Sequence, residues 1–387
     1  MTRGRRLRAG LGVLAVTALL LSACGDDGDS SSSGSDGSSG SGSSGDTSAE
    51  VTNQDAQDMV DALLAGDVEY NLPTESVDPG EHHIAIIASG LASPGPAVLA
   101  QNAEDAVKAI GWTADPTTDG KFTPTTQAQL IQQAVLDKVD GIILVAITPA
   151  AVDAAVQAAA DADIPVVCAL CGPGLPDGMV GVGNDPDAAG EAQAAYAASV
   201  AKPGDTVVVY QNSEFQQSEE QMSHAADTVE ELCPDCKVER PDLTLAESAT
   251  PNAPIFTSLL QQYGEGDLSS VLVPFDTPAS VLANSAQALG RTDFNVVGLG
   301  ALSPFVDMVG AGQPVVAKAD VLLSTPLYGW ASVDELARVL AGADTWDAES
   351  MPVGLVDEST YGNYEKGNLF ILPQDDWKGT FTSLWGK

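Results

Sequence analysis

From residue 84 onward, short runs of consecutive apolar residues alternate with longer segments in which apolar residues recur at helical spacing. A short unbroken apolar run is typical of a strand buried on both faces, and a recurrence at roughly every third or fourth residue is typical of an amphipathic helix. The first half of the pattern predicts strands at 84–88, 141–146 and 165–168 and helices at 97–110, 127–136 and 150–162. The second half predicts strands at 205–210, 237–240, 270–273 and 295–299 and helices at 188–200, 218–232, 255–263 and 279–289. Alternation of this kind predicts parallel strands joined by right-handed crossovers, so we expect an α/β protein with two similar doubly wound lobes.

Two lobes of this kind also predict where a ligand binds. Open α/β sheets bind ligands outside the carboxyl ends of their strands. We therefore expect a ligand cleft between the lobes, lined by the loops that follow the strands.

The first residues have the character of an export signal. Four arginines within the first eight positions precede the apolar run 11–21, which is too short to span a bilayer stably. The run ends in Leu21-Ser22-Ala23-Cys24, which resembles the bacterial lipobox. The resemblance implies a signal peptide at residues 1–23 and diacylglycerol on the Cys24 sulfur. An ordinary secretory signal, or an uncleaved anchor with a chance cysteine, is the alternative.

A low-complexity segment follows this cysteine. Residues 24–50 consist largely of Gly, Ser and Asp and contain almost nothing that can bury apolar area. We predict a disordered tether that holds a folded body away from the surface to which Cys24 is attached; a disordered tail without an anchoring role is the alternative. The remaining roughly 340 residues are enough for two domains of ~100–200 residues each.

The formal net charge of −38 excludes one class of partner. A strongly negative surface repels nucleic acid and anionic lipid, so we expect neither as a partner. Solubility or a salty exterior accounts for the charge, which does not identify the ligand. No later segment has about 18 consecutive apolar residues, so we expect no further membrane span.

Apart from Cys24, the cysteines form two CxxC pairs, Cys168 with Cys171 and Cys233 with Cys236. Such pairs bind zinc in many cytosolic proteins. An exported chain reaches an oxidising compartment, where two local disulfides are the favoured state. A zinc site and a redox-active CxxC are the alternatives, and we expect neither a metal nor a cofactor.

A series of short motifs is spread along the chain. They are Ile84-Ala-Ile-Ile-Ala-Ser-Gly-Leu-Ala-Ser-Pro94, Asp140-Gly-Ile-Ile-Leu, Ala162-Asp-Ile-Pro-Val-Val, Val182-Gly-Asn-Asp185 with Ala189-Gly190, Phe275-Asp276 and Val296-Val-Gly-Leu-Gly300. In order and spacing they resemble the type I periplasmic binding proteins, the group of the ribose and galactose receptors. The resemblance covers roughly residues 81–365 and implies two lobes joined by a three-stranded hinge, which the chain crosses near residues 184, 319 and 352. The first lobe would hold residues 80–184 and 320–352, and the second 185–319 and 353–387.

The resemblance also implies which residues contact the ligand, because the contacts in this family come from loops that follow the strands. The matching positions are Ser89, Ser93, Leu170, Asn212, Phe215, Phe275, Asp276 and Asp320. The chain departs from the sugar-binding relatives nearby, with Gly95-Pro96 in place of an aromatic pair and Ala169-Leu170 in place of a charged Asp-Arg fork. The expected cleft is therefore poorer in charged hydrogen-bonding groups than a monosaccharide site.

Asp276 is the residue that best fits the family pattern. A carboxylate at this position accepts hydrogen bonds from ligand hydroxyl or amine groups, although a role as N-cap of the predicted helix 279–289 is the alternative. We expect a sugar or sugar-like ligand. A less polar organic solute held mainly by apolar walls is the alternative, since each unreplaced hydrogen bond of a sugar costs roughly 1–3 kcal/mol.

Nothing in the sequence supports an enzyme. The histidines are His82, His83 and His224, which lie away from the predicted cleft, and no GxSxG, HExxH or Walker A spacing is present. The resemblance implies the solute receptor of an ABC importer, a monomer anchored at the extracytoplasmic face of the membrane that docks on a permease. A sensory receptor that presents its ligand to a membrane kinase is the alternative. The export signal and the negative charge exclude a DNA-binding regulator of the same fold.

Overall fold

The computed structural model describes residues 53–364, 370–373 and 376–387. The predicted signal peptide at 1–23, the lipidation site Cys24 and the predicted tether at 24–50 lie outside the described residues. Residues 50–387 form one unit, which carries both lobes. Within the described part of the chain, no helix is both long and apolar enough to cross a bilayer.

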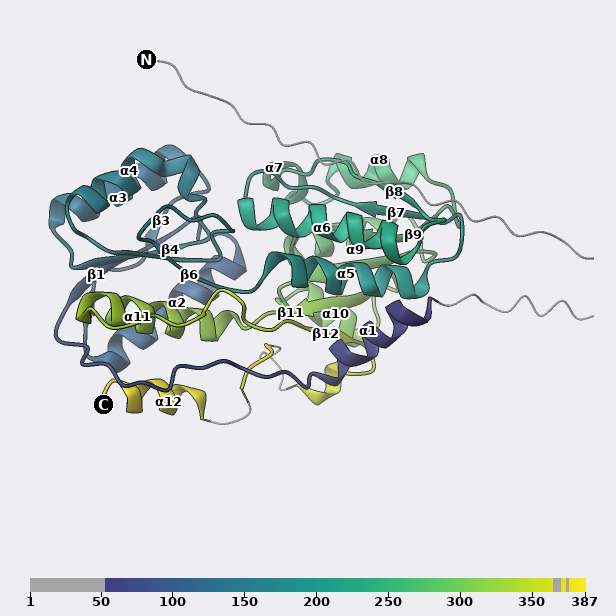
Figure 1. Cartoon of the computed structure of the whole chain (residues 1–387). Helices are drawn as coiled ribbons and strands as arrows, with labels where there is room; N and C mark the ends of the chain where they lie inside the picture. The colour runs from purple at the N-terminus through teal and green to yellow at the C-terminus, as the bar shows by residue number, and fades with distance from the viewer. Residues whose placement is uncertain (1–52, 365–369, 374–375) are drawn as a thin grey trace, which may run out of the picture. The chain divides into compact units, whose positions relative to one another are not determined.

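The first lobe is built on a parallel sheet. Its strands are β1 (His83–Ala88), β2 (Thr113–Ala114), β3 (Thr118–Asp119), β4 (Gly141–Val145), β5 (Val166–Ala169) and β6 (Val180–Val182). Its helices are α2 (Pro94–Ile110), α3 (Pro124–Asp137), α4 (Asp153–Asp161) and α11 (Thr325–Ala341), with a 3-10 turn η1 (Pro149–Val152) before α4. The strand order is β2-β1-β4-β5-β6, and β3 also pairs with β1. Ile84 and Ile86 of β1 pack with α2 and α11, whereas Ile87 packs with α3 and α4, so helices cover both faces of the sheet (Figure 1).

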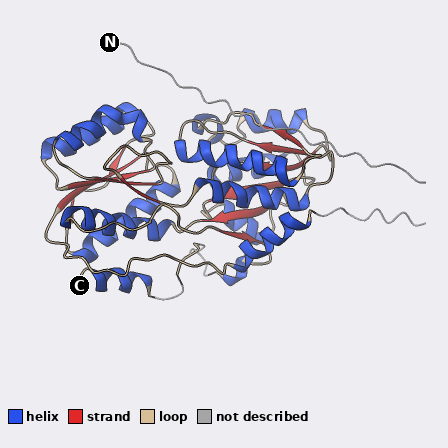
Figure 2. Cartoon of the chain, in the orientation of Figure 1, coloured by secondary structure: helices blue, strands red, loops and turns tan. Residues whose placement is uncertain are grey.

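The second lobe repeats this plan. Its strands are β7 (Thr206–Val209), β8 (Lys237–Glu239), β9 (Leu268–Leu272), β10 (Asn295–Leu299), β11 (Ala317–Leu322) and β12 (Gly354–Asp357). Its helices are α1 (Gln54–Ala65), α5 (Pro186–Val200), α6 (Gln216–Leu232), α7 (Leu245–Ser248), α8 (Pro254–Gln262), α9 (Asp276–Ala288) and α10 (Phe305–Ala311), with a 3-10 turn η2 (Tyr361–Asn363). The strand order is β12-β11-β10-β9-β7-β8, and only β12, among the described strands of this sheet, runs antiparallel to its neighbour. The prediction of two similar α/β lobes with parallel sheets is confirmed (Figure 2).

Local chemistry explains where these elements begin and how deeply they are buried. Proline stands in the first turn of α2, α3 and α5, where its missing N–H costs no hydrogen bond. α2 ends at Gly111, whose φ of 87° is a left-handed cap that glycine adopts without a Cβ penalty. Strands β4, β5 and β7 are buried at every position, as expected of parallel strands covered on both faces.

The lobe boundaries differ from the expected ones in detail. Asn184 and Met351 pair in an isolated parallel bridge where the chain crosses between the lobes. β11 pairs with β10 through Val321 and with β12 through Leu322, so the chain leaves the second lobe after Leu322, slightly beyond the crossing expected near residue 319. Helix α1 precedes the expected start of the first lobe at residue 80, and it packs on α5 and β12 of the second lobe.

A further difference concerns helix α12 (Trp377–Leu384), which falls in the range 353–387 expected for the second lobe. It packs on α11 of the first lobe instead. The reason lies in the aromatic residues: the ring of Trp385 stacks on Trp330 at 5.6 Å, and its Nε1 donates to Asp334 at 2.8 Å. Burial of the two stacked rings and the hydrogen bond from the Trp385 indole to Asp334 stabilise this docking.

Candidate functional site

A cavity of about 370 Å³ lies where the carboxyl ends of both sheets converge. The loops that line it follow six strands: Ser89, Ala146 and Leu170 follow β1, β4 and β5, and Pro274, Gly300 and Leu323 follow β9, β10 and β11. Parallel strands end at the same edge of a sheet, so the fold itself brings these loops of both lobes together. The cavity therefore coincides with the cleft that the sequence predicts.

Ser89 provides one polar group in this cavity. It directly follows β1, is fully buried, and donates its backbone N–H to the carbonyl of Val145 at 2.9 Å. Its hydroxyl oxygen has no hydrogen-bond partner among the described residues. A buried hydroxyl without a partner costs roughly 1–3 kcal/mol, so a ligand atom that bonds to it would recover that free energy.

Three phenylalanine rings form an aromatic wall that reaches from one lobe to the other. Phe122 belongs to the first lobe, and Phe215 and Phe275 belong to the second. Phe215 meets Phe122 edge-to-face at 6.2 Å and Phe275 at 6.4 Å between ring centroids. Phe122 packs over Gly90, where a Cβ atom would lie 2.3 Å from the ring, so glycine is required at that position.

Asp276 is the one ionisable side chain among the described residues that line the cavity. It is the first residue of α9, and its Oδ2 accepts a hydrogen bond from the N–H of Leu302 at 2.6 Å. A Cβ atom on Gly298 or Gly300 would lie 2.8 Å or 3.0 Å from the carboxylate oxygens, so these glycines leave room for it. The carboxylate thus holds the loop after β10 and does not cap its own helix.

A second carboxyl group lies behind Asp276. Asp320 is fully buried on β11, in register with Gly298 of β10. Burial and the neighbouring Asp320 raise the pKa of Asp276 well above its usual range, and burial raises the pKa of Asp320 to about 7. Two adjacent carboxylates cannot both stay charged in a site without a counter-ion, so the pair retains a shared proton near neutral pH.

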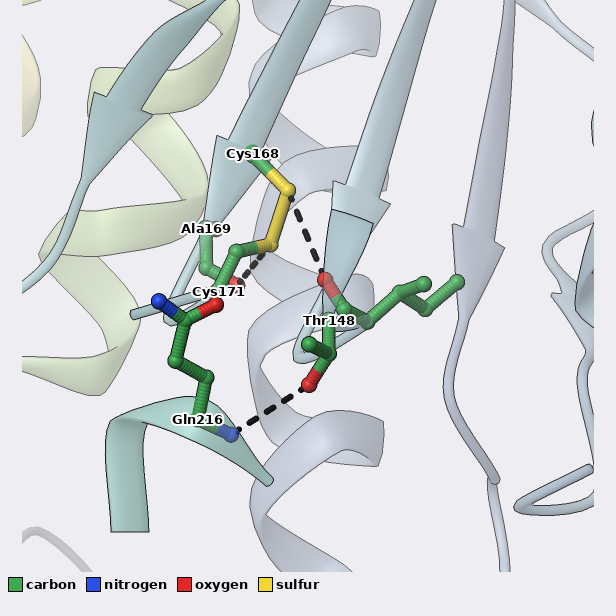
Figure 3. Close-up of a disulfide and its surroundings, with 6 residues drawn as sticks. Thr148, Cys168, Ala169, Cys171 and Gln216 are labelled. Atoms are coloured by element: carbon green, nitrogen blue, oxygen red, sulfur yellow. Dashed lines mark hydrogen bonds between the residues drawn. A yellow bond between two sulfur atoms is a disulfide. The ribbon is translucent and has the colours of Figure 1, made fainter. Parts of the chain in front are cut away.

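Thr148, which follows β4, and the loop after β5 lie beside the start of α6 of the second lobe (Figure 3). A disulfide between Cys168 and Cys171 closes this loop. Gln216, at the start of α6, donates its backbone N–H to Oγ1 of Thr148 at 3.3 Å and its Nε2 to the carbonyl of Pro173 at 2.6 Å. Helix α6 of the second lobe is thereby held against two loops of the first.

The second CxxC pair also forms a disulfide in the structure. Cys233 and Cys236 are joined directly after α6, and neither lines the cavity. Among the described residues, no three His, Cys, Asp or Glu side chains are grouped so that they could hold a metal ion.

Six of the eight ligand positions expected from sequence line the cavity: Ser89, Ser93, Leu170, Phe215, Phe275 and Asp276. Asn212 does not, because it is buried and its Nδ2 donates to the carbonyl of Leu243 at 2.7 Å. Asp320 lies outside the lining and reaches the cavity only through Asp276. Sequence reasoning missed Phe122, which follows the two-residue strand β3, an element too short to leave a periodic signal.

Comparisons with known proteins agree with this geometry. The family model described as periplasmic binding protein domain matches residues 84–344. A sequence search of curated proteins found no match.

Solved structures share the fold at low sequence identity. An ABC sugar transporter subunit from Rhodobacter sphaeroides is 23% identical over 72% of this chain and 98% of its own, with a TM-score of 0.65. An ABC transporter solute binding protein from Agrobacterium vitis with bound allitol is 20% identical over 73% and 97%, with a TM-score of 0.66. One from Bacillus halodurans with bound myo-inositol is 18% identical over 75% and 99%, with a TM-score of 0.65.

Proposed function

The chain belongs to the periplasmic binding protein family, and we propose that it is the extracytoplasmic solute-binding component of an ABC importer, which captures a sugar or sugar-like molecule. The observation that carries the proposal is the cavity at the carboxyl ends of both sheets. Among the polar side chains that line this cavity, Ser89 of the first lobe and Asp276 of the second each have a buried oxygen that accepts no hydrogen bond from the rest of the described lining. A solute that bonds to both would hold the lobes together.

Capture works by closure of the lobes around the solute. In this structure the lobes touch beside the cavity through Gln216 and the loop after β5, and Nε2 of Gln217 donates to the carbonyl of Asn184 at 3.3 Å. Hinge motion between two lobes would break these contacts and admit the solute. The solute then adds contacts to the closed form only, so its binding free energy is what shifts the population towards closure.

A less polar organic solute is the second candidate. The observation in its favour is the wall of Phe122, Phe215 and Phe275, together with the absence of any basic side chain from the described lining. Such a wall recovers free energy from apolar area and leaves few hydrogen bonds for a densely hydroxylated ligand.

The proposal extends to where the protein works and with what. The lipobox-like Leu21-Ser22-Ala23-Cys24 supports a lipid anchor at Cys24 and a location at the extracytoplasmic face of the membrane. Family membership supports a membrane permease as the partner of a monomeric receptor, and it supports a binding role without catalysis. Replacing Cys24 by serine should move the protein from the membrane fraction to the soluble fraction, and an unchanged distribution would contradict the anchor.

The direct test of the proposed function is a thermal-shift screen of the purified protein against panels of sugars, polyols, amines and aromatic acids. A solute that binds only the folded state at a hundred times its Kd adds about 2.7 kcal/mol to stability, which raises the melting temperature by several degrees. A hit among sugars or polyols supports the proposal, and a hit only among aromatic acids favours the less polar solute. No shift with any compound would count against a solute receptor.

A further inference from the structure

The charges around the cavity indicate which chemical class of solute it binds. Resting on the proposed function, we infer that the solute carries a protonated amine, which binds between the carboxyl group of Asp276 and the aromatic wall of Phe122, Phe215 and Phe275. Amino sugars and other small organic amines have this chemistry.

The first argument is the single negative charge that Asp276 and Asp320 keep when the two carboxyl groups share one proton, which no basic side chain of the described lining offsets. Asp276 is 5% exposed, and its Oδ1 makes no hydrogen bond to the described residues outside the pair with Asp320. No Lys, Arg or His is among the described residues that line the cavity. A buried carboxylate without a counter-ion carries a desolvation penalty of several kcal/mol. A ligand cation would offset this penalty, whereas a neutral hydroxyl offers one hydrogen bond and no charge.

The position of the pair keeps this charge in place. Asp320 adds a second carboxyl group directly behind Asp276, and the N–H of Leu302 holds Oδ2 of Asp276 at 2.6 Å. Gly298 and Gly300 clear the space that the carboxylate occupies. The negative group is therefore built into the floor of the cavity and does not swing out into solvent.

The aromatic wall is the second argument. A cation within about 6 Å of an aromatic ring centroid is attracted by the negative face of the ring, and the attraction grows when the cation is desolvated. Phe122, Phe215 and Phe275 are all partly exposed, and all three line the same cavity as Asp276. Carboxylate and rings together favour an ammonium group over an anion, which Asp276 would repel.

The remaining polar side chains of the lining are neutral. Ser89, Ser93 and Gln217 can exchange hydrogen bonds with hydroxyl groups on the rest of the solute. A solute with one amine and several hydroxyl groups would satisfy both the charged floor and these neutral groups.

The test compares matched solutes that differ at the amine. Binding of glucosamine, glucose and N-acetylglucosamine is measured by calorimetry at pH 7, alongside phenethylamine and 2-phenylethanol. In whichever set binds, we expect the amine, glucosamine or phenethylamine, to have a Kd at least roughly tenfold lower than the neutral compounds of the same set. An amino-sugar hit and a phenethylamine hit distinguish the two kinds of amine.

Variants separate charge from shape. Asp276→Asn should abolish the preference for the amine, so that the ratio of the Kd values of the charged and neutral members approaches one. Asp320→Asn removes a carboxyl group that does not touch the solute and that raises the pKa of Asp276, so the negative charge is confined to Asp276 and the preference for the amine should persist or increase. A loss of the preference in this variant would contradict the proposal, so it serves if Asp276→Asn fails to fold. Ser93→Ala is the matched control in the lining and should weaken both members of a pair equally.

The outcomes separate the two hypotheses. Neutral sugars that bind as tightly as their amines, with no effect of Asp276→Asn on the ratio, would overturn the amine and leave the proposed function standing. A protein that binds none of these solutes and none of the wider screening panels contradicts both.

Discussion

The contact between the loop after β5 and helix α6 predicts how a single methyl group changes affinity. Gly172 has a φ of 88°, and a Cβ atom at this position would lie 2.8 Å from the backbone nitrogen of Gln217 and 3.0 Å from Cβ of Gln216. Because Gly172 and Gln217 belong to different lobes, an alanine here obstructs the closed arrangement. It leaves the open arrangement free of the clash.

Gly174 is a matched control in the same loop. Its φ of 72° is also left-handed, but its nearest neighbour is Nε2 of Gln216 at 4.0 Å. Alanine in the left-handed region costs roughly 1–2 kcal/mol at either position. Overpacking adds roughly 1–3 kcal/mol only for Gly172→Ala, which corresponds to a Kd about 5 to 150 times higher for any solute that requires closure.

The assay is calorimetric titration of both variants with the solute that gives the largest shift in the screen, together with melting of each variant without solute. We expect equal melting temperatures for Gly172→Ala and Gly174→Ala without solute, and weaker binding for Gly172→Ala alone. Equal affinities of the two variants would refute the argument that contact between this loop and α6 belongs to the solute-bound state.

Other features of the structure predict changes in stability. Burial raises the pKa of Asp320 from 3.8 to about 7. The protonated group therefore stabilises the fold fully below pH 4, and this stabilisation is lost as the pH rises through 7. At about 1.4 kcal/mol per pH unit, the free energy of unfolding falls by about 4 kcal/mol over this range. Asp320→Asn should therefore flatten the decline in urea-unfolding free energy between pH 4 and 8, and an unchanged slope would contradict the buried pair. Hydrogen bonds from Arg291 lower the pKa of Asp293 to about 2. This ion pair therefore stabilises the fold above pH 4, and its contribution is lost as the pH falls through 2. Asp293→Asn should lower the unfolding free energy at pH 7 by about 1–3 kcal/mol and leave it unchanged at pH 2. Trp385→Ala should lower the unfolding free energy by about 3–5 kcal/mol because it removes the ring that stacks on Trp330. Trp385→Phe should lower it by about 1–3 kcal/mol because Oδ1 of Asp334 loses the indole N–H as its hydrogen-bond donor. Similar unfolding free energies for wild type and Trp385→Phe would show that this hydrogen bond contributes nothing net.

The fold could be predicted from the sequence because its strands are buried on both faces. The largely apolar segments predicted as strands at 141–146 and 295–299 are both strands in the structure, over Gly141–Val145 and Asn295–Leu299. Periodicity fails where the elements are very short or where packing is decided at long range. β3 has two residues, and helix α11 is buried along most of its length, so it has no polar face to mark it.

The site, like the fold, could be predicted from the sequence where it depends on local pattern and could not where it depends on long-range packing. Ser89 directly follows β1 and Asp276 stands at the end of the short loop after β9, so the rule that ligands bind at carboxyl ends leads to them. Asp320 was expected as a ligand contact because of its place in the chain, but only the register of β11 against Gly298 shows that it faces Asp276. Pairing of a carboxyl group on a helix with one on a strand far away in sequence cannot be predicted from a local pattern.

The exchange of outer helices between the lobes constrains the order in which this protein can be completed. Helix α1 packs on the second lobe although it precedes the first sheet, and α12 packs on the first lobe although it follows the second sheet. Domains fold as they emerge during synthesis, N-terminal parts first. Here Trp330 lacks its stacking partner Trp385, and α1 lacks its packing partner α5, until much later residues have been synthesised. Neither lobe can therefore complete its packing before the rest of the chain has been made. A chain that ends before α12 would leave the ring of Trp330 exposed and would be more easily cleaved by proteases.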